Sequence, residues 1–102
     1  MVKQLLARQS YLSSLQSAIN TYKHVPQKAI MRRVSGEVRV SIEIDRHGRV
    51  LKTGFVEASK YDFFNEQAEE AINKAAPFTP VPEVLTGETF TFEVLLYYPP
   101  YF

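Results

Sequence analysis

The hydrophobic positions of the first 23 residues recur with the period of an α-helix. Large apolar side chains follow one another at spacings of seven, three, four and three, at Leu5, Leu12, Leu15, Ile19 and Tyr22. This spacing places them on one stripe of a helix that runs from Val2 to about Lys23. Serine, glutamine and asparagine fill the other side. We therefore expect an amphipathic helix that lies on a core, with residues before about Ser10 free to fray.

A proline separates this helix from a shorter one. Pro26 restricts the residue before it and presets the first turn of a new helix. The second helix is predicted from Pro26 to about Arg33, with Ala29 and Ile30 facing inward. It should stop near Ser35-Gly36.

From Glu37 the hydrophobic period changes to two. Four apolar residues alternate with polar ones, at Val38, Val40, Ile42 and Ile44, as in a half-buried strand. The next four residues, Asp45-Arg46-His47-Gly48, combine an Asx-type turn starter with a glycine suited to positive φ. They predict a hairpin to a second strand, Arg49 to Ala58, in which Gly54 indicates a bulge.

A third helix is predicted from about Phe63 to Ala76, with Asp62 as its cap. Its narrow apolar stripe consists of Phe64, Ala68, Ala71, Ile72 and Ala75. Pro77 ends the helix, and the chain to Pro82 must be extended because alternate prolines fit neither a helix nor a central strand.

The last strand follows a turn at Thr86-Gly87-Glu88. It runs from Thr89 to Tyr97, and its inward side consists of Phe90, Phe92, Val94 and Leu96. The strand is long and contains neither proline nor lysine, which are the residues that usually protect a sheet edge.

The order α-α-β-β-α-β predicts an α+β fold with a three-stranded antiparallel or mixed sheet. The hairpin strands are neighbours, and the third helix returns the chain so that the last strand lies beside the first, a split βαβ. The Glu37 strand is then central, the helices cover one face, and both outer strands have open edges. An open edge such as Thr89 to Tyr97 invites pairing with another strand.

Composition indicates one domain over residues 1–102, with a helix at 1–23 and a core at 26–98. A chain of 102 residues with 45% hydrophobic residues supports a single core, and the lack of cysteine excludes a disulfide scaffold or thiolate zinc site. No apolar run approaches the ~20 residues of a membrane span, and Met1 to Tyr11 does not resemble a signal peptide. By itself, the chain is expected to be neither exported nor anchored.

Charge is distributed unevenly along the chain. Residues 1–52 contain ten basic and three acidic residues, whereas residues 53–102 contain two basic and eight acidic ones. The basic residues, among them Lys28, Arg32 and Arg33, are interspersed with apolar ones and form solvated faces of folded elements. We therefore predict no nucleic-acid partner.

The sequence contains no group of residues arranged for catalysis. His24 and His47 are far apart in the topology and lack ligand spacing. The carboxylates Glu66, Glu69 and Glu70 fall on the exposed side of the third helix. A general acid needs a carboxyl group held in an apolar pocket, and an exposed helix face provides none. The four glycines form no phosphate loop. The sequence predicts no enzyme, no cofactor and no metal.

The carboxyl end, Tyr97 to Phe102, is rich in aromatic residues. Such a cluster is usually either covered or used. It can fold back over the sheet, or it can extend an edge or reach a partner, and the first alternative is favoured.

Several short motifs, in order, resemble the TonB C-terminal domain family. They are Pro26-Gln27-Lys28-Ala29, Gly36-Glu37-Val38-Arg39-Val40, Gly48-Arg49-Val50, Phe64 and Ala68 in a helix, and Ala76-Pro77-Phe78-Thr79-Pro80 before a final strand. The likeness covers about residues 11 to 98. The helix from Tyr11 to Tyr22 is similar to one in the related TolA C-terminal domain.

The resemblance implies a periplasmic binding domain of a protein anchored in the inner membrane of a Gram-negative bacterium. Such proteins transmit energy from ExbB and ExbD, which contact the N-terminal region, to outer-membrane receptors for siderophore iron, haem or vitamin B12. The domain grips the receptor's TonB-box peptide as an added strand. Carried over by position, the gripping backbone is that of Phe90, Thr91, Phe92, Glu93, Val94, Leu95 and Leu96.

Two alternatives stay open beside this interpretation. One is a TolA-like domain that binds the Pal lipoprotein and colicin or phage proteins. The other is a structural module that forms a homodimer through a sheet edge. Val25 replaces the family's tyrosine before the helix-starting proline, so the resemblance does not assign peptide contacts to Tyr22–Val25.

Overall fold

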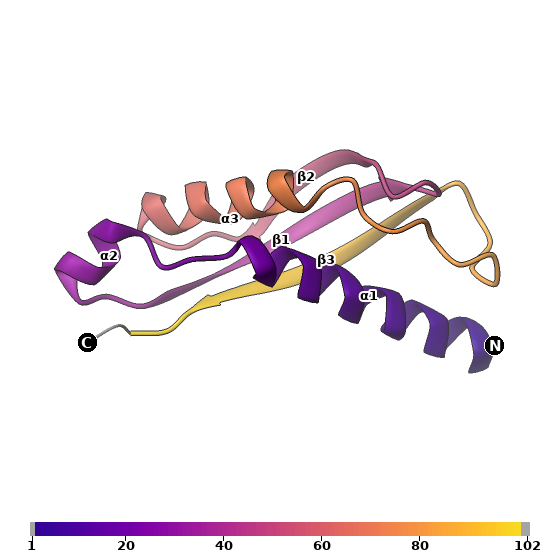
Figure 1. The fold of residues 1–102 in the computed structure, drawn as a ribbon, viewed down its shortest axis with the longest axis horizontal. Helices are drawn as coiled ribbons and strands as arrows, with labels where there is room; N and C mark the ends of the chain where they lie inside the picture. Colours follow the sequence, from indigo (N-terminus) through magenta and orange to yellow (C-terminus); the bar gives the residue numbers. More distant parts are fainter. Residues whose placement is uncertain (1, 101–102) are drawn as a thin grey trace.

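Three helices and three strands follow one another along the chain in the predicted order. The computed structural model describes residues 2–100 and contains α1 (Val2–Tyr22), α2 (Gln27–Arg32), β1 (Gly36–Asp45), β2 (Val50–Glu57), α3 (Asp62–Ala75) and β3 (Thr89–Tyr98) (Figure 1). The predicted α+β class is confirmed. Among residues 2–100, no helix combines the length and apolar character needed to cross a bilayer.

The sheet has the order β2-β1-β3, and both neighbouring pairs are antiparallel. Val40 at the centre of β1 lies opposite Val94 of β3 and Phe55 of β2. The four alternating apolar residues of β1 are all buried, which confirms the predicted strand and its inward face. The predicted split βαβ with a central first strand is therefore present, in its fully antiparallel form.

Two bulges shape β2, and neither lies at Gly54. The register skips Val56 between the partners of Arg39 and Val40, and it skips Leu51 between the partners of Glu43 and Ile44. Gly54 pairs regularly with Ser41, so the prediction of a bulge at Gly54 is wrong. Each skipped residue reverses the alternation, because two residues of β2 then face one residue of β1.

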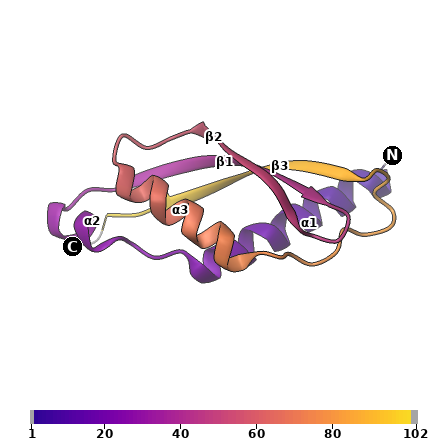
Figure 2. The same cartoon turned by 90° about the horizontal axis from the view of Figure 1, so that it is seen from above.

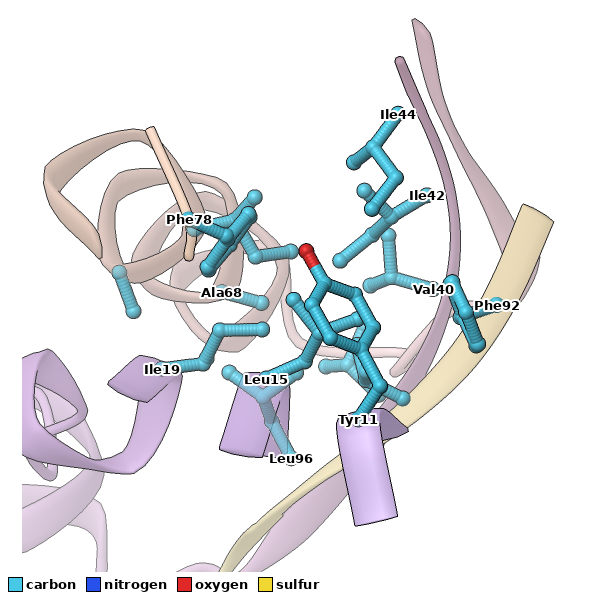
Figure 3. Close-up of a cluster of buried hydrophobic side chains, with 14 of the residues drawn as sticks. Tyr11, Leu15, Ile19, Val40, Ile42, Ile44, Ala68, Phe78, Phe92 and Leu96 are labelled. Atoms are coloured by element: carbon cyan, nitrogen blue, oxygen red, sulfur yellow. The ribbon is translucent and has the colours of Figure 1, made fainter. Parts of the chain in front are cut away.

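Helices α1 and α3 cover the same face of the sheet (Figure 2). The core between the helices and the sheet combines residues from α1, β1, β3, α3 and the loop after α3 (Figure 3). They include Tyr11, Leu15, Ile19, Val40, Ile42, Ile44, Ala68, Phe78, Phe92 and Leu96. Figure 3 shows the Tyr11 ring inside this cluster, and its hydroxyl donates to the Thr79 carbonyl at 2.5 Å. Burial and the nearby Asp45 carboxylate raise the pKa of the Tyr11 phenol.

The predicted stripe of α1 is correct only in its middle. Leu15 and Ile19 are buried, but Leu5 and Tyr22 are 56% and 45% exposed, and the buried Tyr11 was not predicted. Residues 11, 15 and 19 are buried in the core, whereas Leu5 in the first turns of α1 faces an open groove. The helix nevertheless continues to Val2, where fraying was expected.

The third helix begins with a different cap from the one predicted. Tyr61 is the N-cap residue and Asp62 the first helical residue, so the prediction of Asp62 as cap is wrong. The side chain of Asn65 instead accepts the Ser59 N–H at 2.8 Å and donates to the Ser59 carbonyl at 2.9 Å. The predicted apolar stripe of α3 is otherwise confirmed, with Ala75 partly buried.

The β1–β2 turn forms as predicted and holds the loop that leads into β3. Asp45 Oδ1 accepts the N–H groups of His47 and Arg49 at 2.9 and 3.0 Å, and these bonds keep the pKa of the Asp45 carboxyl below its usual range. Gly48 has φ 88° and its carbonyl accepts the Phe78 N–H at 2.8 Å. The extended loop is thereby fixed to the hairpin.

Arg46 also holds the loop that leads into β3. Its guanidinium donates to the carbonyls of Leu85 and Gly87 and lies 5.3 Å from the ring centre of Phe90. The Val81 N–H donates to the Arg46 carbonyl at 2.9 Å. These contacts determine where β3 begins.

Candidate functional site

The seven residues predicted to grip a peptide all lie in β3, and their side chains divide between two faces. Phe90, Phe92, Val94 and Leu96 are buried in the core, while Thr91 and Glu93 are exposed and Leu95 is half-buried. A partner could therefore contact the backbone of β3 and three of the seven side chains.

The backbone of alternate residues in β3 points away from the sheet. The carbonyls of Thr91 and Leu95 accept hydrogen bonds from α1, and that of Tyr97 accepts one from Lys23 just after the helix, so they face away from β1. In an antiparallel ladder the N–H and C=O of one residue point to the same side. Thr91, Glu93, Leu95 and Tyr97 thus direct their donors and acceptors to the outer edge, as strand addition requires.

An open groove lies beside the first residues of β3. It has a volume of about 440 Å³ and is lined by Leu5 and Arg8 of α1, by Leu85 and Thr86 of the loop, and by Thr89 to Thr91. The exposed side chain of Leu5 forms an apolar part of its wall. An extended segment can reach the edge of β3 at this point.

Side chains of α1 and of Lys23, the residue after it, occupy the outer edge of β3 from this groove onward. Arg8 Nη2 lies 2.6 Å from the Thr91 carbonyl oxygen, Gln16 Nε2 lies 2.5 Å from that of Leu95, and Lys23 Nζ lies 2.6 Å from that of Tyr97. The Arg8 guanidinium also lies 4.4 Å from the ring centre of Phe92. The edge predicted to be open is therefore covered in part by the protein's own helix.

Sequence reasoning missed these three residues because polar positions of a surface helix are ordinarily solvated. A signal was present, since the three are eight and seven positions apart, about two helical turns each. That spacing places Arg8 and Gln16 on one side of α1, and Lys23 directly follows the last helical residue. Lys23 also lies within the Tyr22–Val25 segment to which the resemblance assigned no contact.

A buried hydrogen-bond chain fixes the end of β3. The Tyr98 hydroxyl donates to Gln67 Oε1 at 2.6 Å, and Gln67 Nε2 donates to the Tyr22 carbonyl at 3.2 Å. Burial raises the pKa of the Tyr98 phenol. Gln67 is buried although its sequence position suggested nothing of this role, and it connects β3, α3 and α1.

The aromatic end divides at Tyr98. Tyr97 is 50% exposed, whereas Tyr98 is buried and stacks on Phe64 with a centroid distance of 4.8 Å. Tyr98 continues β3 opposite Gly36 and does not fold back over the sheet, so the favoured alternative is wrong at this residue. The predicted cluster continues to Tyr101 and Phe102, which lie outside the described residues.

The remaining candidate residues from the sequence do not come together in a second functional site. His24 lines a groove of about 280 Å³ with Lys28, Glu66 and Glu70, while His47 lies at the distant hairpin turn. Within residues 2–100, no three histidine, aspartate or glutamate residues form a group that could hold a metal ion.

The protein is thus a small α+β domain, and its candidate binding site is the backbone along the outer edge of β3. Residues 21–99 match the family described as Gram-negative bacterial TonB protein C-terminal. The chain belongs to this TonB C-terminal family, and the resemblance inferred from its motifs is confirmed. The match separates the TonB-like interpretation from the TolA-like one.

Two curated relatives and two solved structures support the assignment. The relatives are TonB proteins of Helicobacter pylori strains 26695 and J99, 37% and 36% identical over 73 residues, which is 72% of this chain and 26% of each relative. Two solution structures of the H. pylori TonB C-terminal domain have TM-scores of 0.74 and 0.68 at 34% identity. Each covers 87% of this chain, and the chain covers 79% and 92% of them.

A more distant structure shares the fold. The C-terminal domain of Pseudomonas aeruginosa TonB has a TM-score of 0.55 at 20% identity, covering 76% of this chain and 77% of that one. The chain spans about a quarter of the length of the curated relatives. The family description places such domains at the C-terminus of TonB proteins of Gram-negative bacteria.

Proposed function

We propose that this chain is the periplasmic C-terminal domain of a TonB-like energy transducer and that it binds the TonB-box peptide of an outer-membrane receptor along β3. The observation that carries the proposal is the row of outward backbone groups at Thr91, Glu93 and Leu95. The groove beside Thr89 gives an extended segment access to this row. The family match supports a receptor as the partner.

Strand addition obtains its affinity from main-chain hydrogen bonds and its selectivity from alternate side chains. Side chains of the added strand would point in turn toward Leu5 in the groove and toward the exposed Glu93 face of the sheet. No catalytic group is needed for this function, and the domain acts as a non-enzymatic coupler without a cofactor.

Coupling to energy requires parts of the protein beyond this domain. In the proposed arrangement an N-terminal region anchors the protein in the inner membrane and contacts ExbB and ExbD. The domain then passes force to receptors for siderophore iron, haem or vitamin B12. The particular receptor follows from the peptide that binds most tightly.

The proposal is tested by titrating ¹⁵N-labelled domain with synthetic TonB-box peptides from receptors of the same organism. Amide signals from Thr89 to Tyr97 should shift. Glu93→Pro removes an outward N–H while leaving the β1 ladder intact, and it should weaken binding about fivefold more than Glu93→Ala. Shifts confined to another surface, or equal binding by the two variants, would contradict the site.

Self-association is a second candidate function, favoured by the other edge of the sheet. Every residue of β2 from Leu51 to Glu57 is exposed, including the apolar Phe55 and Val56. A homodimer would pair two such edges, although the bulges at Leu51 and Val56 oppose regular pairing. Sedimentation over a wide concentration range decides, because a persistent monomer excludes this function.

A further inference from the structure

Two side chains of α1 and that of Lys23, the residue after the helix, stand where the N–H groups of a partner strand would stand. Arg8, Gln16 and Lys23 donate to three carbonyls that all face outward from β3, at 2.5 to 2.6 Å. The Glu93 carbonyl lies between the first two and receives none of these three bonds. These three side chains thus supply a row of donors along the outer side of β3, with a gap at Glu93.

An added strand and these side chains cannot occupy the edge together. Neighbouring strands lie about 4.8 Å apart, and their N–H groups approach the carbonyls along the direction that α1 now uses. Donor atoms within 2.6 Å of the Thr91 and Tyr97 oxygens stand inside the space that a strand backbone would fill. A peptide must therefore displace them.

The contacts are built so that they can be displaced without unfolding the domain. The bonds from Arg8 and Lys23 are solvent-exposed and come from long, flexible side chains. The helix itself is held separately by Tyr11, Leu15 and Ile19, which are buried in the core. The side chains can swing away while the helix stays docked.

We infer that the side chains of Arg8, Gln16 and Lys23 form a removable cap on the peptide-binding edge, while α1 stays docked. This inference rests on the proposed function. A peptide enters at the groove beside Leu5 and Thr89 and then replaces the three side chains in order along β3. Without a peptide, the cap keeps the edge from pairing with other strands.

Two of the three capping residues belong to a part of the chain that the family match does not include, and Lys23 lies just inside the match. The match begins at residue 21, so Arg8 and Gln16 lie before it, whereas the strand that they cover lies within it. The shared domain provides the edge, and the preceding helix provides its control.

The test compares peptide affinity in three proteins by calorimetry. The cap variant carries Arg8→Ala, Gln16→Ala and Lys23→Ala. The control variant carries Lys3→Ala, Gln4→Ala and Lys28→Ala, which likewise removes two basic residues and one glutamine, from exposed positions that do not donate to β3. The probe is the TonB-box peptide that binds the unmodified domain most tightly, with a version carrying alternate prolines as a negative control.

The cap variant should bind the peptide about tenfold more tightly than the unmodified domain, because the three side-chain hydrogen bonds to β3 no longer compete. The control variant should match the unmodified domain. If the triple substitution fails to fold, as its amide spectrum would show, Arg8→Ala alone should still give about twofold tighter binding.

Two results would overturn the inference, and they differ. Clear binding by all three proteins, with the cap variant equal to or weaker than the unmodified domain, would contradict the cap and leave the proposed function standing. An absence of binding by all three would contradict the proposed function and the cap with it.

Discussion

Gly48 is the residue at which the β1–β2 hairpin touches the loop before β3. Its φ of 88° is unfavourable for residues with a side chain, and a Cβ atom there would lie 2.1 Å from the Phe78 carbonyl oxygen. Both atoms belong to or adjoin the backbone, so neither can swing aside.

Gly48→Ala should therefore lower the free energy of unfolding by about 2 kcal/mol or more. Gly54→Ala is the matched control, because a Cβ at Gly54 would meet nothing within 4 Å. Urea unfolding of both variants measures the difference. Equal stability of the two variants would contradict the close approach seen at Gly48.

Local chemistry was predictable from sequence at this scale, and pairing was not. The roles of Asp45 and Gly48 follow from the turn alone, because they depend on hydrogen bonds and dihedral angles within a few residues. The bulges at Leu51 and Val56 depend on how β2 aligns with β1 across the hairpin. Gly54 attracted the bulge prediction only because it is a glycine.

The elements are held together near the end of β3 by a polar chain inside the core. Tyr98 is fully buried, and its hydroxyl donates to Gln67, which in turn donates to the Tyr22 carbonyl at the end of α1. Each of the three groups comes from a different element. This chain of hydrogen bonds therefore connects α1 and β3 to α3.

Tyr98→Phe should cost about 1–3 kcal/mol of stability, because the buried Gln67 Oε1 then loses its donor. Tyr97→Phe provides the control, since Tyr97 is its exposed neighbour in the same strand and should be nearly neutral. Thermal or urea unfolding compares the two. A Tyr98→Phe variant as stable as Tyr97→Phe would show that the buried hydrogen bond contributes nothing.

Element types and inward faces followed from periodicity, but the outer surfaces of the elements did not. The alternation in β1 and the stripe of α3 predicted their buried faces because both elements lie over the core along their whole length. Helix α1 extends past the sheet, so Leu5 is exposed despite its helical spacing. The use of Arg8, Gln16 and Lys23 depends on where α1 lies relative to β3, which no periodicity describes.

The whole molecule is elongated along its strands, with extents of 46 × 24 × 21 Å. Its two sheet edges differ: β3 is bordered by α1 and the three capping side chains, whereas β2 is exposed and interrupted by two bulges. The β3 edge is regular and its cover can be displaced. The β2 edge is uncovered and irregular. A peptide strand is therefore expected at β3.

Fold and edge were predictable together because the topology follows from element order. Once the last strand lies beside the first, β3 must be an edge. That this edge is partly closed was not predictable, since the closure comes from side chains 74 to 83 residues away in sequence.

The central claim is that a receptor peptide becomes a fourth strand beside β3. Isotope-filtered NOE spectra of the labelled domain with unlabelled TonB-box peptide test it most directly. The account predicts contacts between peptide backbone protons and those of Thr91, Glu93 and Leu95, with no contacts to residues of β2. Peptide contacts to β2, or to side chains alone without a backbone ladder along β3, would contradict it.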